Sequence, residues 1–313
     1  MTLAFVFPGQ GSQSEGMLKD LAATYPLVGE TFAQASDRLG YDLWRIVQDG
    51  PVEDLNRTDI TQPAMLAAGV ATWRVWREQG GAMPAVMAGH SLGEYSALVC
   101  AGSLDFSDAI GLVAERGRLM QDAVPAGEGA MAAILGLDDD AVRQACEAAA
   151  EGEVLAPVNF NSPGQVVAAG NKSAIERLVN VAKERGAKRA LVLPVSVPSH
   201  CSLMQPAADK LAAVLEQIEV KAPQIPVINN VDVAAPGDPA AIRDALVRQL
   251  SNPVRWVETV QKMAADGVDR LIECGPGKVL VGLNKRIDKS IAAEAVFDPA
   301  SLEASLQTVA SNA

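Results

Sequence analysis

The sequence predicts an α/β fold in which a parallel sheet with its helices forms the larger part and a smaller subdomain is inserted. Two observations carry this prediction. Short apolar runs alternate with helical stretches at both ends of the chain, the pattern of strands joined by crossover helices. Between residues 126 and 195 the order changes to strand, helix, strand, strand, helix, strand, which is the split βαβ or ferredoxin-like arrangement.

The larger subdomain is therefore expected at residues 1–125 and 196–313, and the ferredoxin-like subdomain at 126–195. A chain of 313 residues is long enough to bury a core in each part. Pro125-Ala126-Gly127 and Pro194 mark the two crossings, because proline and glycine interrupt helices and strands.

The first strand is expected at Leu3–Phe7, an apolar run that stops at the turn Pro8-Gly9. Helical stretches follow, and Pro63 is tolerated because it falls in the first turn of the clearest one. Before the insert the pattern predicts one more strand and three helices: the strand Ala85–Ala88 and the helices Ile60–Gln79, Leu92–Ala101 and Phe106–Asp122.

Four strands and two helices are expected in the insert: Ala130–Leu135, Asp138–Ala150 (helix), Val154–Asn159, Gln165–Ala169, Ser173–Arg185 (helix) and Arg189–Leu193. The α/β alternation then resumes with helices at Leu203–Gln217, Ala240–Leu250 and Val254–Asp266 and strands at Val227–Ile228 and Arg270–Glu273. Residues 231–239 are expected as a surface loop, and residues 301–313 as a short amphipathic helix or a frayed end.

Composition and charge exclude several classes of protein. Hydrophobic residues make up 49% and charged residues 20% of the chain, which is typical of a globular protein. The net charge of −12 argues against a nucleic-acid binder, because phosphate contacts need clustered Lys and Arg, yet it leaves room for a small basic patch. Four scattered cysteines and two histidines predict no metal site.

Neither a membrane span nor a signal peptide is expected. No apolar stretch approaches the roughly 20 residues that a spanning helix needs. The first residues, MTLAFVFPGQ, lack a basic n-region and fit a first strand. We therefore expect a cytoplasmic protein with reduced thiols.

The segment Gly89-His90-Ser91-Leu92-Gly93 fits the G-x-S-x-G pattern of a nucleophile elbow. It lies between a predicted strand and a predicted helix, which is where an elbow belongs. Ser91 would then sit at a helix N-terminus, whose unpaired N–H groups can hold developing negative charge. The alternative is a glycine-rich turn whose serine only caps the following helix.

A serine nucleophile needs a base, and the chain offers two histidines. His90 ends the strand while Ser91 lies on the turn, so their side chains should diverge and His90 should pack within the elbow. His200, in Val197-Pro198-Ser199-His200-Cys201, is the better candidate, although a plain surface histidine is the alternative. No acidic residue stands out to orient this base, but a backbone carbonyl can accept the imidazole N–H.

Two further features point to a binding site. Arg116 and Met120 lie one helical turn apart, and the guanidinium could hold a substrate carboxylate with both of its N–H arms. A solvated arginine on a helix surface is the alternative. The loop Phe7–Gln13 follows the first strand and could supply a second oxyanion donor, whereas it lacks the Gly-Lys-Ser/Thr of a phosphate loop.

Eight segments together carry a family resemblance: FPGQGSQ (7–13), TQPA (61–64), GHSLGEYSAL (89–98), ERG with Met120 (115–120), VNFNSPGQVV (158–167), VPSH (197–200), VRQL with NPV (247–254) and GPGKVL (275–280). The sequence resembles the malonyl-CoA:acyl-carrier-protein transacylases of bacterial type II fatty-acid synthesis over nearly its whole length. The resemblance implies an α/β-hydrolase-like larger part with a ferredoxin-like insert.

The resemblance also implies roles. Ser91 would be the acylated nucleophile, His200 its base, and the backbone carbonyl of Gln249 the acceptor that orients the base. Arg116 would bind the malonyl carboxylate. The remaining expected substrate contacts are the backbone N–H groups of Gln10 and Leu92 as oxyanion hole, Gln62 as a polar pocket residue, and Met120.

The implied reaction moves a malonyl group from malonyl-CoA to the phosphopantetheine thiol of acyl carrier protein through a malonyl-serine ester, supplying fatty-acid elongation. The implied partners are malonyl-CoA and acyl carrier protein, with no cofactor beyond the CoA thioester substrate. Because carrier proteins are acidic, docking needs a local basic patch. The candidates are Lys183, Arg185, Lys188 and Arg189 on the insert, and Lys278, Lys285 and Arg286 near the GPG turn.

Two rival functions share some of these features. A serine acyl hydrolase or esterase would have the same elbow, but a neutral ester needs no cationic partner such as Arg116. A non-catalytic acyl-binding protein would have no use for Ser91, His200 and Arg116 together.

Overall fold

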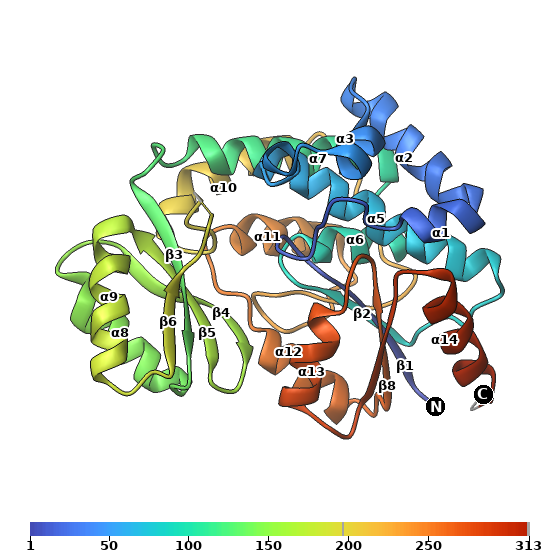
Figure 1. The fold of residues 1–313 in the computed structure, drawn as a ribbon. Coiled ribbons are helices and arrows are strands. Elements are labelled where there is room, and N and C mark those ends of the chain that lie inside the picture. Colours follow the sequence, from blue (N-terminus) through green and yellow to red (C-terminus); the bar gives the residue numbers. More distant parts are fainter. Residues whose placement is uncertain (196, 312–313) are drawn as a thin grey trace.

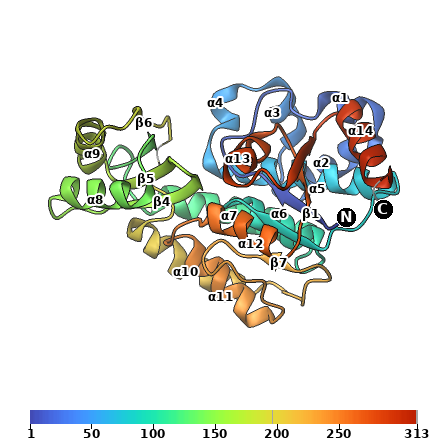
Figure 2. The same cartoon turned by 90° about the horizontal axis from the view of Figure 1, so that it is seen from below.

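The computed structural model describes residues 1–195 and 197–311 and contains two separate β-sheets (Figure 1). One sheet has five strands, all parallel, and the other has four antiparallel strands, which confirms the predicted α/β class. Both ends of the described chain lie at the end of the molecule opposite the four-stranded sheet (Figures 1 and 2).

Before the insert the elements are β1 (Leu3–Phe7), α1 (Lys19–Thr24), α2 (Pro26–Leu39), α3 (Leu43–Asp49), α4 (Val52–Leu55), α5 (Thr58–Glu78), β2 (Val86–Gly89), α6 (Gly93–Cys100) and α7 (Phe106–Asp122). The insert contains β3 (Gly129–Leu135), α8 (Asp139–Ala150), β4 (Leu155–Ser162), β5 (Gln165–Asn171), α9 (Lys172–Glu184) and β6 (Arg189–Val192). The remaining elements are a 3₁₀ turn η1 (Ser202–Met204), α10 (Gln205–Leu215), β7 (Val227–Ile228), α11 (Pro239–Gln249), α12 (Trp256–Ala265), β8 (Arg270–Cys274), α13 (Val279–Ile287), β9 (Ala292–Val296) and α14 (Pro299–Ser311).

The parallel sheet has the strand order β7-β2-β1-β8-β9 and lies between two layers of helices. Successive side chains of its central strand point to opposite faces. Leu3, Phe5 and Phe7 pack into the large core with α2, α5 and α7, whereas Ala4 and Val6 pack into a second core with α12 and α13. Because both faces are covered, the strand is apolar throughout rather than alternating.

The insert has the strand order β4-β5-β3-β6. Numbered within the insert this is 2-3-1-4, the antiparallel order of a ferredoxin-like fold. Helices α8 and α9 pack together against the sheet and enclose a separate apolar core that includes Ile134, Val142 and Leu178.

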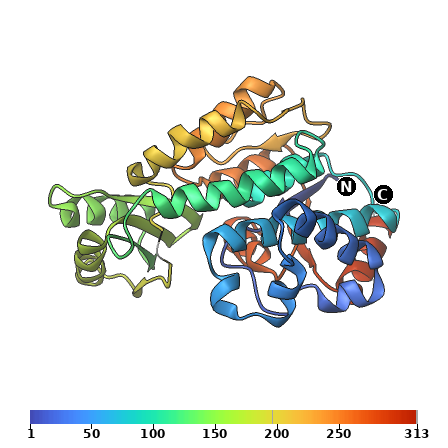
Figure 3. The ribbon, with the colours of Figure 1, turned by 90° about the horizontal axis from the view of Figure 1, so that it is seen from above.

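The insert is joined to the parallel sheet and its helices first by the chain that continues from α7 and second by hydrogen bonds, which include two backbone bonds at Val254. Helix α7 runs along the molecule toward the insert (Figure 3), and its N-terminus is capped by Asp105, whose carboxylate accepts from the N–H groups of Ser107 and Asp108. Beyond α11, Val254 N donates to Val158 O (2.8 Å), and Phe160 N donates to Val254 O (3.1 Å). This second connection holds β4 beside the carboxyl end of the parallel sheet.

The structure differs from the predicted elements at the start of α5 and after residue 200. Helix α5 begins at Thr58, two residues before the expected start, so Pro63 lies inside the helix and its predicted place in the first turn is wrong. The helix expected over Leu203–Gln217 is split into η1 and α10, because Pro206 in the first turn of α10 starts a new helix. The helix expected from Val254 begins at Trp256, since Val254 pairs with β4 instead. Helix α13 and strand β9 were not predicted.

Residue 196, at which the second part of the larger subdomain is expected to begin, lies outside the described residues. The same holds for residues 312–313 of the expected C-terminal helix, which the structure describes as α14 up to Ser311.

Candidate active site

Ser91 lies on a sharp turn between β2 and α6. Its φ of 52° is in the left-handed region, which residues other than glycine rarely adopt. The flanking glycines let the turn pack closely. A Cβ on Gly89 would lie 1.8 Å from the carbonyl carbon of Gly93, and one on Gly93 would lie 2.0 Å from the carbonyl oxygen of Phe7. This strand–turn–helix geometry is that of a nucleophile elbow.

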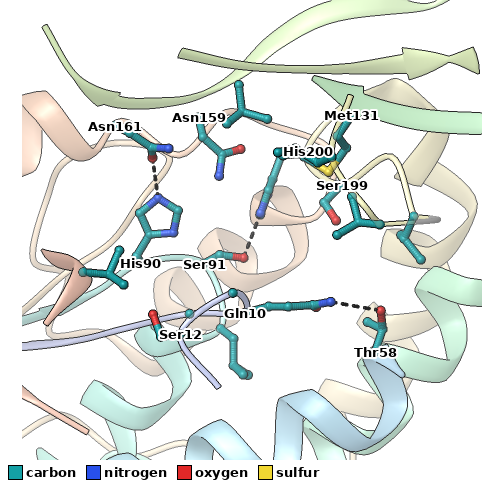
Figure 4. A pocket seen from close by; sticks show the side chains of 18 of the residues that line it. Gln10, Ser12, Thr58, His90, Ser91, Met131, Asn159, Asn161, Ser199 and His200 are labelled. Carbon is teal, nitrogen blue, oxygen red and sulfur yellow. Dashed lines mark hydrogen bonds between the residues drawn. The ribbon is translucent and has the colours of Figure 1, made fainter. Parts of the chain in front are cut away.

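The hydroxyl of Ser91 is hydrogen-bonded to His200, which comes from 109 residues further along the chain (Figure 4). The distance from Ser91 Oγ to His200 Nε2 is 2.8 Å, and the distance from His200 Nδ1 to the backbone oxygen of Gln249 is 2.7 Å. A carbonyl oxygen only accepts, so Nδ1 carries the ring proton and Nε2 accepts from the hydroxyl. His200 is thus arranged as a base toward Ser91.

His200 is buried, and this sets its charge. Burial lowers the pKa of the imidazole to about 3, and the nearby positive charge of Arg116 acts in the same direction. The ring is therefore neutral near pH 7 and can take up a proton.

The neighbouring histidine, His90, points elsewhere. Its Nε2 lies 2.8 Å from Asn161 Oδ1 on β4 (Figure 4). The centroid of its ring is 5.6 Å from that of Trp256. His90 still borders the cavity beside Ser91, but its hydrogen bond ties the elbow to the insert. The two side chains diverge, as expected for a strand end and a turn.

Arg116 lies beneath Ser91, and the surface alternative for this residue is wrong, because only 1% of it is exposed. Its Nη1 donates to Gln62 Oε1 (2.8 Å) and its Nη2 to Gln249 Oε1 (3.0 Å). The same Nη2 is 3.4 Å from Ser91 Oγ. Within the described residues no carboxylate forms an ion pair with this guanidinium.

Gln249 contacts both the base and the arginine. Its backbone oxygen accepts from His200, and its side-chain oxygen accepts from Arg116. Its side-chain nitrogen donates to the Ser91 carbonyl oxygen (3.1 Å) and to Glu94 Oε2 (2.8 Å). One residue at the end of α11 therefore holds two of the predicted site residues.

The two predicted oxyanion donors lie at the same cavity. Gln10 follows β1, and Leu92 directly precedes α6. Across residues 1–195 and 197–311 neither backbone N–H has a hydrogen-bond acceptor. The Gln10 side chain points away from these amides, since its Nε2 contacts Thr58 Oγ1 at 3.4 Å (Figure 4).

The cavity has a volume of about 250 Å³ and opens between the elbow and the insert. Gln62 and Met120 form part of its wall on the arginine side, and the Gln62 Nε2 lies 3.5 Å from Met120 Sδ. The structure brings seven of the eight predicted residues to its wall: Gln10, Gln62, Ser91, Leu92, Arg116, Met120 and His200. Gln249, the eighth, lies behind the wall and is hydrogen-bonded to three of its residues, Ser91, Arg116 and His200.

Sequence reasoning missed the polar residues that surround the predicted set. Asn159, Asn161 and Gln165 border the cavity from β4 and β5. Asn230 accepts from Ser91 N (2.7 Å) and donates to Gly89 O (2.7 Å), so its carboxamide holds both sides of the elbow. A usable signal existed for Asn230, because it follows a predicted strand at the sheet edge where α/β proteins bind ligands.

The described part of the chain contains neither a cluster of metal-binding side chains nor a helix that could span a membrane. No three His, Cys, Asp or Glu side chains between residues 1 and 311, residue 196 aside, come together as a metal site would require. Over the same residues, no helix is both long and apolar enough to cross a membrane.

Comparisons with known proteins agree with this geometry. Residues 4–300 match the acyl transferase domain family. The malonyl CoA-acyl carrier protein transacylase of Salmonella typhimurium is 64% identical over 303 residues, which is 97% of this chain and 98% of the relative.

Two solved structures are also similar. An acyl carrier protein S-malonyltransferase from Vibrio cholerae superposes with a TM-score of 0.95 at 66% identity, covering 97% of this chain and all of the other. A malonyl-transacylase solved in complex with its type II polyketide synthase acyl-carrier protein superposes with a TM-score of 0.97 at 62% identity, covering 98% of this chain and 100% of the other.

Proposed function

The chain belongs to the acyl transferase domain family, and we propose that it is a malonyl-CoA–acyl carrier protein transacylase that carries the malonyl group on Ser91. The observation that supports this most directly is the 2.8 Å contact between Ser91 Oγ and His200 Nε2 beside the buried Arg116. The contact pairs a nucleophile with a base, and the guanidinium provides a partner for a negatively charged acyl group.

In the first half-reaction His200 Nε2 takes the proton of the Ser91 hydroxyl as Oγ attacks the thioester carbonyl carbon. The Gln10 and Leu92 N–H groups, which have no acceptor in the described chain, would stabilise the oxyanion. The carbon–sulfur bond then breaks, and CoA leaves as a thiol with the proton from His200. Malonyl-Ser91 remains.

The second half-reaction reverses these roles. His200 takes the proton of the phosphopantetheine thiol, the sulfur attacks the ester carbonyl, and Ser91 leaves with the returned proton. Every step uses groups of this chain and its substrates, so we propose that no further cofactor takes part.

Arg116 would select the acyl group. A malonyl group ends in a free carboxylate, and in the described structure the guanidinium is hydrogen-bonded only to neutral acceptors. The carboxylate would supply the missing counter-charge in a dry site, where an ion pair is strong. A serine acyl hydrolase for neutral esters would gain nothing from the Arg116 guanidinium. The Salmonella relative and the two similar solved structures are all named as transacylases or malonyltransferases.

For the carrier protein we propose docking near α13. Lys278 and Lys285 are exposed there, close to the cavity wall that Val279, Leu280 and Leu283 form. The insert candidates Lys183, Arg185, Lys188 and Arg189 are exposed as well. We propose the cytoplasm as compartment, because all four cysteines are free thiols.

Intact-mass spectrometry after mixing with malonyl-CoA tests the proposal. A stable malonyl adduct that Ser91→Ala abolishes, and that holo-carrier protein removes, is the expected result. An adduct that decays to free malonate without carrier protein would identify a hydrolase. A protein that acquires no adduct would contradict both enzymatic functions.

A further inference from the structure

A buried carboxyl group, Glu94, lies directly behind the site and has no part in the mechanism above. It is 2% exposed and belongs to the first turn of α6, three residues after Ser91. Its Oε2 accepts from the backbone N–H of Asn230 (2.9 Å) and from the side-chain nitrogen of Gln249 (2.8 Å).

The position of Glu94 fixes the orientation of the Gln249 carboxamide. The nitrogen of that group faces two atoms that only accept, Glu94 Oε2 and the Ser91 carbonyl oxygen. If the carboxamide were turned over, its oxygen would face both acceptors and its nitrogen would face Arg116, so all three contacts would be repulsive. The carboxylate therefore ensures that Gln249 presents oxygen to the guanidinium.

The position of the Arg116 guanidinium depends on its hydrogen bond to that oxygen. A guanidinium has five N–H groups, and within the described chain two carboxamide oxygens, from Gln62 and Gln249, accept the two shortest of its hydrogen bonds. Apart from its bond to Arg116, the Gln62 carboxamide has among the described residues only the weak contact of its nitrogen with Met120 Sδ to hold its orientation. Gln249 is thus the better anchored of the two supports.

The arrangement also places an ionisable carboxyl group near Arg116 without a direct ion pair. A carboxylate in contact with the guanidinium would occupy the N–H groups that a substrate carboxylate needs. Here one carboxamide separates the two, and the acid and the cation influence each other across it. Burial raises the pKa of Glu94 to about 7, while the hydrogen bonds from Gln249 and Asn230 and the charge of Arg116 act against the increase.

We propose that Glu94 is a positioning residue that determines acyl specificity: through the Gln249 carboxamide it holds the Arg116 guanidinium in place and open toward the substrate carboxylate. The inference rests on the proposed function. It assigns a role to a residue that touches neither the substrate nor the reacting atoms.

The test compares the rates at which malonyl-CoA and acetyl-CoA acylate Ser91 in single-turnover experiments, read by intact mass. In Glu94→Ala the malonyl-to-acetyl rate ratio should fall about tenfold or more, which corresponds to losing a charge-assisted hydrogen bond. Glu94→Gln is the matched variant, because one amide oxygen can accept from both Asn230 and Gln249, and it should restore most of the ratio. An unchanged ratio in Glu94→Ala would overturn the proposal.

A double-mutant cycle separates this role from general support of the fold. If Glu94 acts through Arg116, then Glu94→Ala should leave the ratio unchanged once Arg116 is already alanine. An equal further loss in that background would overturn the proposal. Should Glu94→Ala not fold, Gln249→Met interrupts the same path, keeps the backbone oxygen that holds His200, and should lower the ratio by a similar factor.

The proposed function is judged separately in the same assay. A wild-type protein that malonyl-CoA does not acylate contradicts the function itself. A wild-type protein that is acylated, with a ratio that all Glu94 variants retain, contradicts only the role of Glu94.

Discussion

His200 Nδ1 lies 2.7 Å from the backbone oxygen of Gln249, so a neutral carbonyl orients the predicted base in place of a carboxylate. A carboxylate there would stabilise the imidazolium and raise its pKa. The carbonyl fixes the tautomer and affects the pKa of the imidazole less than a carboxylate would. Burial together with the charge of Arg116 then keeps the ring neutral. The geometry of the base and its charge state are therefore set by different groups.

This arrangement predicts the pH dependence of acylation. The pKa of His200 is lowered in the folded protein, so the ring stays neutral, and able to accept a proton, through the range where an ordinary histidine becomes charged. The rate of Ser91 acylation should show no loss from His200 as the pH falls through about 6.5. Stopped-flow release of CoA between about pH 5 and pH 8 checks this in the Glu94→Gln variant, which lacks the carboxyl group whose pKa burial raises to about 7. An inflection near an ordinary histidine pKa in that variant would contradict it.

The same shift predicts the sign of a stability effect. Because the folded pKa lies below the unfolded one, the unfolded chain binds more protons as the pH falls below about 6.5. The stability contributed by neutral His200 is fully present above that pH and decreases below it. Urea unfolding of the wild type and His200→Gln should show a smaller loss on acidification in the variant.

Removal of the base should reduce catalysis without affecting binding of CoA. His200→Ala should slow malonyl transfer by roughly 10³-fold or more, by analogy with other nucleophile–base pairs. Steady-state transfer to carrier protein measures this, with circular dichroism as the control for folding. Turnover at the wild-type rate would assign the base to another group.

Loss of the guanidinium should act on malonyl selectively. Arg116→Ala should weaken malonyl transfer by about 2–5 kcal/mol, as expected when a desolvated charge loses its partner. Acetyl transfer should suffer less, because it offers no carboxylate. Comparing kcat/KM for the two thioesters checks this, and equal losses would show that Arg116 has only a structural role.

The elbow glycines should be intolerant of a side chain. Gly89→Ala would place a Cβ 1.8 Å from the backbone of Gly93, so the variant should lose about 3 kcal/mol or more or fail to fold. Gly282→Ala in α13 is the matched control, because its Cβ would meet nothing within 4 Å and a helical alanine should stabilise by about 0.5–1 kcal/mol. Thermal unfolding of both variants measures the difference.

Carrier-protein docking near α13 is best tested at Lys285. Lys285→Glu should raise the KM for carrier protein and leave that for malonyl-CoA unchanged. Arg286 is a less suitable test, since its guanidinium donates to Gln165 Oε1 (2.7 Å) and Pro163 O (3.3 Å) at the cavity rim. An unchanged carrier-protein KM in Lys285→Glu would direct attention to the basic residues of the insert.

Local sequence signals predicted the parts of the molecule that local interactions determine. Helix α7 agrees with its predicted range at both ends, because its apolar period is regular and Asp105 caps its start. Strand β9 was not predicted, because its sequence AAEAV contains only one β-branched residue. It lies at the edge of the sheet, where fewer neighbours constrain the choice of side chain. Its pairing with β8 depends on the whole sheet.

The site shows the same division. The glycines around Ser91 carry a pattern that can be read directly, whereas the partner of His200 is a peptide carbonyl, which every residue possesses and no pattern marks. The interactions of Glu94 and Asn230 join segments 136 residues apart, so only the folded chain reveals them.

The backbone bonds at Val254 hold the insert independently of the side chain at that position. To swing the insert away from the parallel sheet, the protein would have to break both of them and also the hydrogen bond between His90 and Asn161. Both bonds at Val254 use only main-chain N–H and C=O groups. Any residue other than proline at this position therefore keeps the donor and the acceptor that hold the insert in place.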